Sequence, residues 1–254
     1  MIVIISPAKT LDFKTHSSTR RFSIPDLLDD SQILIQELKK LNPTDIMKLM
    51  KVNSEIATLN FERNLSWRLP FTLDNAKQAL LAFKGQVFVG LDANTLTEDD
   101  LIFAQNHLRI LSGFYGILRP LDLIQAYRLE MGIALKNPKG KNLYEFWGTK
   151  ITKILNKELE QQKENVLINL ASNEYFKSVN PKQIQADIIT PVFKELRGNE
   201  YKTITVYAKT ARGYMSRFII ENRITNPNDI KSFDVGGYLY SHDLSNAKQW
   251  VFVR

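Results

Sequence analysis

Cysteine is absent from this chain and histidine is scarce. Without cysteine there is no disulfide, thiolate metal site, iron–sulfur ligand or thiol nucleophile. His16, His107 and His242 lie far apart without metal-ligand spacing, and no Glu-x-x-His pattern typical of carboxylate iron sites occurs. The sequence therefore predicts neither a metal site nor a cofactor.

Long apolar runs are also missing. No stretch approaches the roughly 20 apolar residues of a membrane-spanning helix. The N-terminal residues MIVIISPAKT have no basic segment, and their apolar run is too short for a signal peptide. Together with the lack of cysteine, these features favour a cytoplasmic protein that has no membrane partner.

Positive charge is in excess. The 254 residues carry a net charge of +7, and the isoelectric point is about 9.4. Such an excess favours encounter with polyanions, nucleic acid above all, although it also serves solubility. The composition is otherwise ordinary for a globular protein, with 44% hydrophobic residues.

Apolar periodicity predicts alternating strands and helices. Strands are expected at residues 1–6, 86–90, 127–131, 166–170, 186–193 and 201–208, with a closing hairpin at 237–240 and 249–253. Helices are expected at residues 25–41, from 43 onward, and at 74–83, 97–112, 142–162 and 209–223. This pattern favours a mixed α/β (α+β) fold, with one domain over residues 1–254 that has a central mixed sheet and flanking helices.

The most informative tract is VYAKTARGYMSRFIIENR, residues 206–223. Lys209, Arg212, Ser216 and Arg223 fall on one helical ridge, because steps of three, four and seven residues stay on one face. No acid accompanies them on this ridge, which predicts an anion site, with phosphate as the expected anion. Arg217 points away from the ridge, and is expected either at a second edge of the same cleft or on a structural partner.

Two further segments offer phosphate-binding groups. Ser6-Pro7-Ala8-Lys9-Thr10 follows the first strand, where α/β proteins commonly place ligands, and Lys9 could supply a charge. It has no glycine-rich loop and is not a Walker A motif. Gly113 and Gly116, in LSGFYGILRPLD, resemble a helix-hairpin-helix that presents N–H groups to phosphate; a tight packing turn is the alternative.

Carboxylates lie near some of these cations. Arg128 and Glu130 alternate along a predicted strand, so they either pair with each other or form an anion site in which Glu130 orients Arg128. Glu174 and Lys177 follow the strand at 166–170 and are candidate catalytic groups, because a tuned carboxylate can act as a general base. At a spacing of three residues they could equally form a helical ion pair.

Five segments in matching order resemble the YaaA peroxide-stress protein family: SPAKTLD, FAQNHLRILSGFYGILRPLDLIQAYRLEMG, LYEFWG, INLASNEYFKSV and YAKTARGYMSRFIIENR. The resemblance implies a role in peroxide resistance through limiting free intracellular iron. It also implies a mixed α/β fold with a positively charged cleft and a helix-hairpin-helix-like element, and DNA binding that includes distorted duplexes. Family residues carry over as Lys9, Arg119, Arg128, Lys177, Lys209, Arg212 and Arg217.

The leading hypothesis is therefore a monomeric DNA-binding stress protein that contacts double-stranded or distorted DNA without reading its sequence. It would help limit free iron and protect DNA from oxidation. The alternative is an enzyme that acts on a nucleotide or phosphorylated small molecule in a basic pocket. A third possibility, an interaction protein without ligand chemistry, predicts that the basic residues scatter over the surface.

Overall fold

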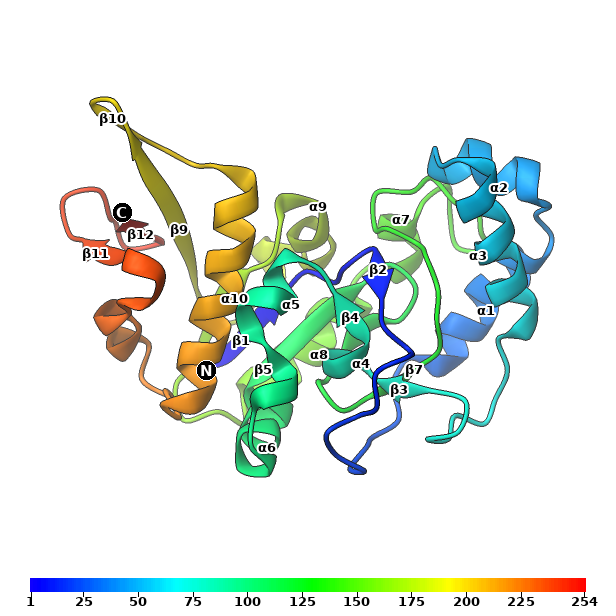
Figure 1. Cartoon of the computed structure of the whole chain (residues 1–254), viewed down its shortest axis with the longest axis horizontal. Helices are drawn as coiled ribbons and strands as arrows, with labels where there is room; N and C mark the ends of the chain where they lie inside the picture. Colours follow the sequence, from blue (N-terminus) through cyan, green and yellow to red (C-terminus); the bar gives the residue numbers. More distant parts are fainter.

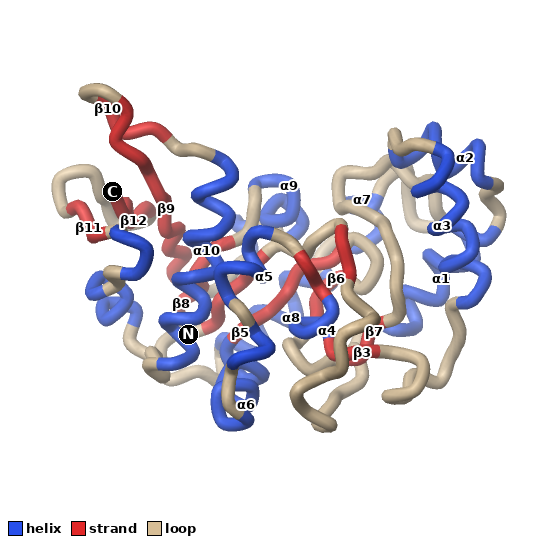
Figure 2. The backbone as a smooth tube through the Cα atoms, viewed as in Figure 1, coloured by secondary structure: helices blue, strands red, loops and turns tan.

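A mixed eight-stranded sheet forms the centre of the computed structural model, which describes residues 1–254 (Figure 1, Figure 2). Five neighbouring strands, in the order β12-β9-β8-β1-β5, run parallel. The strands β11, β6 and β10 join β12, β5 and β9 as antiparallel neighbours. Their bounds are β1 Ile2–Ile5, β5 Leu108–Ser112, β6 Gly116–Leu118, β8 Val166–Leu170, β9 Asp187–Arg197, β10 Glu200–Lys202, β11 Leu239–Ser241 and β12 Gln249–Val253. The expected α/β class with a central mixed sheet is confirmed.

Strand β1 lies in the middle of the sheet and is buried on both faces. Its residues Ile2–Ile5 are all apolar and β-branched, which suits a strand covered by helices. From β1 the chain crosses to β5 on one side, and from β8 it continues to β9 on the other. The strand order therefore reverses between β1 and β8, and such a switch point leaves a crevice at the carboxyl ends of the two strands.

The chain has ten α-helices. They are α1 Leu28–Lys39, α2 Pro43–Met50, α3 Ser54–Ser66, α4 Ala79–Ala82, α5 Gln86–Leu91, α6 Glu98–His107, α7 Leu143–Trp147, α8 Lys150–Leu159, α9 Asn173–Phe176 and α10 Thr205–Glu221. Helix α10 packs on β9, α5 packs along α10, and α6 contacts both β1 and β5. The helices α1, α2 and α3 form a lobe at the opposite end of the molecule from β10 and β12 (Figure 1).

Shorter elements connect these layers. Two small antiparallel pairs are formed by β2 Thr10–Leu11 with β4 Phe83–Lys84, and by β3 Lys77–Gln78 with β7 Leu123–Ile124. Five 3₁₀ helices follow, at Ala93–Thr95, Lys177–Val179, Pro181–Gln183, Pro227–Ser232 and Val235–Gly237. The pair β2–β4 links the segment after β1 to the start of α5, so the two segments approach each other.

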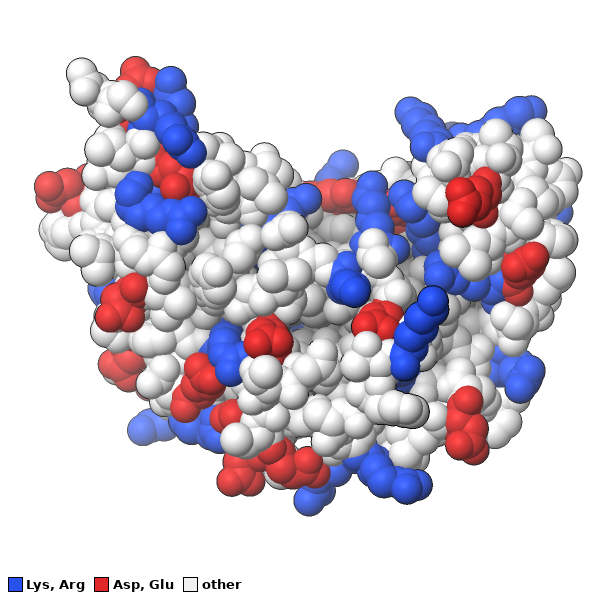
Figure 3. All heavy atoms as spheres, in the orientation of Figure 1, with Lys and Arg blue, Asp and Glu red and all other residues white.

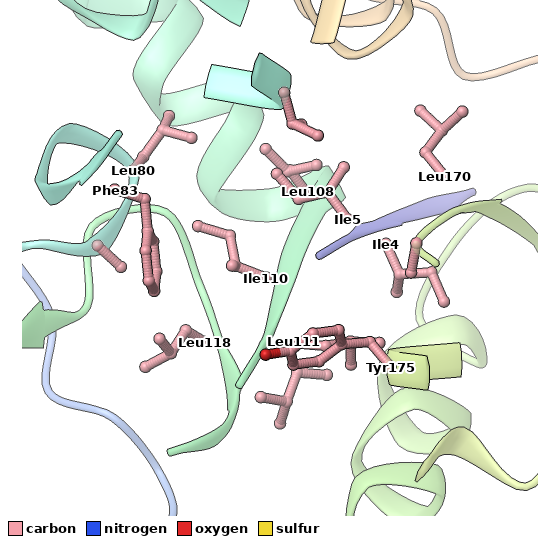
Figure 4. Close-up of a cluster of buried hydrophobic side chains, with 14 of the residues drawn as sticks. Ile4, Ile5, Leu80, Phe83, Leu108, Ile110, Leu111, Leu118, Leu170 and Tyr175 are labelled. Carbon is pink, nitrogen blue, oxygen red and sulfur yellow. The ribbon is translucent and has the colours of Figure 1, made fainter. Parts of the chain in front are cut away.

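One continuous core holds the layers together. It joins 66 buried hydrophobic residues from the sheet and from helices at both ends, so the chain folds as one unit. Figure 4 shows part of this core, where Ile5 of β1 lies near Leu108 of β5 and Leu111 lies beside Tyr175. Burial of this apolar surface is the main driving force of folding.

Helix starts were predicted better than short apolar segments. Asn42 and Thr97 begin α2 and α6 as expected, each with a capping box that satisfies free backbone donors. The expected strand at 86–90 is instead helix α5, because a short apolar run fits either structure until its packing decides. The expected strand at 127–131 has no regular structure.

Other helix boundaries also differ from expectation. The helix predicted over 74–83 is only α4, Ala79–Ala82, and strand β3 precedes it at Lys77–Gln78. The helix predicted over 97–112 ends at His107, and β5 follows directly. The helix predicted over 142–162 is two helices, α7 and α8, separated at Gly148, which has a φ of +50°. Helix α10 begins at Thr205, so half of the expected strand at 201–208 is helical and β10 ends at Lys202.

Candidate functional site

A pocket of about 400 Å³ opens at the carboxyl ends of β1 and β8, where the strand order reverses. We call it the central pocket. Four segments distant in the sequence line it: residues 6–10 after β1, 84–88 at β4 and α5, 127–130, and the segment after β8. Lys209 and Arg212 of α10 complete the lining. Ligands of open α/β sheets bind at such a position.

The two strand-end segments are tied to each other. The backbone N–H of Ser172 donates to Ser6 Oγ at 2.8 Å, and Ser6 Oγ lies 3.3 Å from Ser172 Oγ. These bonds hold the loop after β1 against the loop after β8, so the floor of the pocket is fixed by the sheet. Lys9, three residues beyond Ser6, extends its side chain into solvent with 67% exposure.

Helix α10 supplies two cations to the central pocket. Lys209 and Arg212 lie one turn apart, and neither forms an ion pair. The Nε atom of Arg212 is buried and has no hydrogen-bond partner. Burial lowers the pKa of Arg212, because its charge is partly removed from water without an acid to compensate. Arg212 therefore carries an unsatisfied preference for an anion.

The segment 127–130 supplies the other charged side of the pocket. Glu130 Oε1 lies 3.3 Å from Lys9 Nζ and accepts a hydrogen bond from Arg128 Nη2 at 3.1 Å. The pairing of Arg128 with Glu130, one of the two alternatives raised by the sequence, is observed, and both residues also line the pocket. Glu130 Oε2 and Arg128 Nε are buried without partners.

Cations outnumber acids in the pocket lining. The charged residues are the cations Lys9, Lys84, Arg128, Lys209 and Arg212 and the acids Glu130 and Glu174. Five positive and two negative charges leave a net charge of +3. Figure 3 shows the molecule hollowed between its two raised ends, with Lys and Arg side chains gathered in the middle of the hollow. A cavity with this charge attracts anions.

Glu174 reaches the pocket from the start of α9. Its Oε1 accepts a hydrogen bond from the Gly132 N–H at 2.9 Å, and its backbone carbonyl accepts one from the Tyr144 hydroxyl at 2.9 Å. No ion pair forms between Glu174 and Lys177, although their spacing would allow one. Glu174 is the one of the two candidate catalytic residues that lines the central pocket.

Lys177 lies in a different, shallower depression. Its Nζ sits 4.9 Å from the centre of the Tyr144 ring, and it lines a second pocket together with Asn173 and Lys182. The ammonium group therefore has a cation–π partner on the surface. Lys177 therefore does not share the central pocket with Glu174, the other candidate catalytic residue.

The two hairpin glycines lie in a strand–turn–strand unit, which corrects the expectation of a helix-hairpin-helix. Both are buried; Gly113 follows β5 in the turn and Gly116 is the first residue of β6. The N–H groups of Phe114 and Tyr115 donate to Ser112 Oγ, so the turn offers neither of them to a phosphate. Ile110 to Ser112 pair with β6 as a strand, because their side chains complete the core.

Gly113 nevertheless affects the site indirectly. A Cβ atom built on Gly113 would lie 2.3 Å from the Leu129 carbonyl oxygen. Only glycine allows the segment that carries Arg128 and Glu130 to pass this close to the turn. The role of Gly113 is therefore to position the pocket-lining segment.

Arg119 and Arg217 also lie outside the central pocket. Arg119 donates to Asp122 and to the Ile24 carbonyl, and it pairs with Asp26. Arg217 donates to the carbonyls of residues 91 and 92 at the end of α5 and pairs with Glu221. Both guanidinium groups are therefore engaged by other parts of the fold. For Arg217, which was expected either at a second edge of the cleft or on a structural partner, the structural partner is observed.

The last two residues of the predicted basic ridge, Ser216 and Arg223, also lie outside the central pocket. Arg223 pairs with Asp100 of α6 at 2.5 Å, so the expectation that no acid accompanies the ridge is wrong at this position. Ser216 donates its hydroxyl to the Arg212 carbonyl within the helix and is buried. Only the first two members of the ridge, Lys209 and Arg212, face the pocket.

Sequence reasoning missed Lys84 and the neighbouring Gln86. Lys84 lies on β4, which pairs with β2 just after Lys9, and it has no acid partner. Gln86 Oε1 accepts from Thr210 Oγ1 at 3.0 Å and so links α5 to α10. The one available signal was a lysine beside Gly85 between two short apolar segments, which is a weak indication of a binding loop.

The structure contains no group of three or more His, Cys, Asp or Glu residues placed to hold a metal ion. Its helices include none that combines the length and the apolar character needed to cross a membrane.

Comparison with known proteins places this sequence among close relatives. The sequence profile described as "Peroxide stress protein YaaA" matches residues 1–244. A UPF0246 protein of Shewanella loihica is 53% identical over 254 residues, covering the whole chain and 98% of that relative. UPF0246 proteins of Aliivibrio fischeri strains MJ11 and ES114 are each 54% identical over the same coverage.

Proposed function

The chain belongs to the peroxide stress protein YaaA family, and we propose that within the peroxide response it binds DNA through the phosphate backbone. The proposed contact region is the central pocket and the hollow around it. Binding of this kind neutralises phosphates without reading bases, so it is independent of sequence.

The observation that supports this proposal most strongly is the unpaired state of Lys209 and Arg212. Other arginines of the chain, such as Arg119 and Arg217, are held by acids and carbonyl groups. Lys209 and Arg212 lack an acid and stand in a cavity with an excess of cations. A half-buried guanidinium without a partner is costly unless an anion completes it.

The proposed benefit under peroxide stress is protection of the bound DNA from oxidation. Any effect on free intracellular iron would then follow indirectly from nucleic-acid binding. The proposal assigns no iron ligands to this chain. It rests on the charge and geometry of the pocket together with the family's association with peroxide.

The test is the affinity for fluorescently labelled duplexes of several sequences, measured by anisotropy over a range of salt concentrations. We expect affinity to fall steeply with salt and to vary little with sequence. The Lys209→Ala/Arg212→Ala double variant should bind every duplex about tenfold more weakly or worse, with a salt slope lower by roughly 2.

A matched control removes two other cations. Lys153 and Lys157 are exposed on α8 and form no ion pair, so Lys153→Ala/Lys157→Ala changes the net charge equally but leaves the pocket intact. The control should lose much less affinity than the pocket variant. If the pocket variant keeps its affinity, or if both double variants lose the same amount, the proposed contact region is wrong.

A second candidate function is an enzyme that acts on a nucleotide or phosphorylated small molecule. The observation in its favour is the presence of Glu174 in a cationic pocket, where a carboxylate could take up a proton. The test is peroxide resistance of cells that carry Glu174→Gln, which keeps the Gly132 hydrogen bond through its amide oxygen. Full resistance would argue against catalysis by this residue.

A further inference from the structure

Buried polar atoms without partners concentrate in the central pocket. Four buried side-chain nitrogen or oxygen atoms in the structure lack a hydrogen bond, and three of them belong to Arg128, Glu130 and Arg212. Buried polar groups in native proteins are almost always satisfied, so each exception requires an explanation. The simplest one here is a ligand that supplies the missing partners.

The three atoms without partners require hydrogen-bonding groups of different kinds. Arg128 Nε and Arg212 Nε are donors and need an acceptor, whereas Glu130 Oε2 is a carboxylate oxygen and needs a donor. Glu130 keeps this oxygen free because Lys9 and Arg128 both engage its Oε1. A simple anion such as inorganic phosphate would satisfy the arginines but would be repelled by the free carboxylate oxygen.

The pocket also has an apolar side. Val87, Phe88 and Leu129 line it and are buried, and Tyr127 presents a ring whose hydroxyl is already bonded to Ser112. Burial raises the pKa of Tyr127, so this phenol remains uncharged. The cavity of about 400 Å³ lies near the lower end of the range found for small-molecule sites.

We propose that the central pocket receives one nucleotide unit, with its phosphate on Lys209 and Arg212 and an N–H donor of its base on Glu130 Oε2. Such a unit combines an anion, a hydrogen-bond donor and a flat apolar body. These three features match the cations, the free Glu130 oxygen and the apolar side of the pocket. This inference rests on the proposed phosphate binding and adds that the base enters the pocket. The unit could be a free nucleotide or an unpaired residue of a DNA strand.

The first experiment uses the unmodified protein and calorimetric titration with deoxyadenosine monophosphate, deoxyribose phosphate and inorganic phosphate. We expect the nucleotide to bind about tenfold or more tightly than deoxyribose phosphate, since the base fills the apolar side and bonds Glu130. Equal affinity for the two would overturn the inference. This comparison needs no variant and so does not depend on the folding of one.

The second experiment uses Glu130→Gln, which should change the affinities for deoxyribose phosphate and for the nucleotide in opposite directions. Removing a negative charge from the pocket should leave deoxyribose phosphate bound as tightly as before or more tightly. The nucleotide should bind roughly three- to tenfold more weakly, because the charge-assisted bond to the base is lost. Glu160→Gln, at the exposed residue that follows α8, removes the same charge outside the pocket lining and should change neither affinity.

A third experiment distinguishes the two sources of the nucleotide. A fluorescent adenine analogue is placed in a duplex, either paired or unpaired, and its emission is followed on binding. A rise that is confined to the unpaired analogue and reduced by Glu130→Gln identifies a strand residue as the occupant. Tight binding of the free nucleotide without any such rise identifies the free molecule.

Failure of this inference differs from failure of DNA binding. If duplexes bind with a steep salt dependence that Lys209→Ala/Arg212→Ala weakens, but nucleotide and deoxyribose phosphate bind alike, backbone binding stands and the base pocket is refuted. If the double variant binds duplex normally but loses the nucleotide, the pocket stands and the DNA proposal is refuted. Weakening of both ligands to the same extent by Glu130→Gln would refute the role given to Glu130.

Discussion

Gly213 of α10 packs directly against Gly90 of α5. A Cβ atom built on Gly213 would lie 2.9 Å from the Gly90 carbonyl carbon and 2.0 Å from the Val87 carbonyl oxygen. A Cβ atom on Gly90 would lie 2.2 Å from the Thr210 carbonyl oxygen. The two helices therefore touch through their backbones, and this contact places Arg212, the residue next to Gly213, in the wall of the pocket.

Gly213→Ala should separate the two helices. The obstructing atoms are backbone, which cannot move aside as a flexible side chain could, so we expect a loss of about 2–3 kcal/mol in unfolding free energy. Denaturant unfolding measures it. Gly132→Ala is the control, because its Cβ would meet only the end of the Glu174 side chain at 3.1 Å. Equal, small losses in both variants would contradict a close backbone contact.

The sheet could be predicted from the sequence where single segments decide their own structure. Residues 166–170 and 249–253 form β8 and β12 as expected, because each is a short, mainly apolar segment rich in β-branched or aromatic residues. Helix α5 could not be predicted in this way. Five of its six residues, QVFVGL, are apolar and two are valines, so the run also suits a strand, and the sequence does not show the close backbone contact that Gly90 makes with α10.

The candidate site could be predicted where a rule of position applies. Lys9 and Glu174 follow parallel strands, and the strand-end rule brought both to the pocket. Partners distant in the sequence could not be foreseen. Asp100 pairs with Arg223 across 123 residues, and the carbonyl of Leu91 accepts from Arg217 across 126. Spacing along one helix predicts a shared face but cannot show what that face meets.

Arg212→Met should stabilise the protein in the absence of ligand. Burial lowers the pKa of Arg212 and no acid compensates its charge, so an apolar side chain of similar length relieves a desolvation cost. We expect a gain of about 0.5–1 kcal/mol in unfolding free energy in phosphate-free buffer. The same variant should bind DNA more weakly, so stability and affinity change in opposite directions.

Arg217→Met provides the comparison for this prediction. Arg217 lies on the same helix and is fully engaged by carbonyl groups, Thr95 and Glu221. Its removal leaves these acceptors unpaired and should cost about 1–2 kcal/mol. A loss of stability in Arg212→Met as large as in Arg217→Met would show that Arg212 serves the fold and not a ligand.

Asp30 should make the stability of the protein sensitive to acid. This buried carboxylate of α1 accepts hydrogen bonds from Lys139 at 2.6 Å and from Lys150 of α8 at 2.7 Å. Burial alone would raise the pKa of Asp30, but the two lysines outweigh it and hold the pKa below its ordinary value of 3.8. Asp30 thus connects the lobe of α1 to the helices beside the sheet.

Because the pKa is lower in the folded state, the stabilisation by Asp30 is present above the unfolded value of 3.8 and is lost as pH falls below it. Asp30→Asn should therefore cost about 1–2 kcal/mol at neutral pH, where the ion pairs are intact, and progressively less in acid. Urea unfolding of both proteins across this pH range measures the difference. The control is Asp29→Asn, at the exposed neighbouring position, which should lower the unfolding free energy by less. If the unfolding free energies of Asp30→Asn and the unmodified protein differ by the same amount at every pH, the role of these ion pairs is refuted.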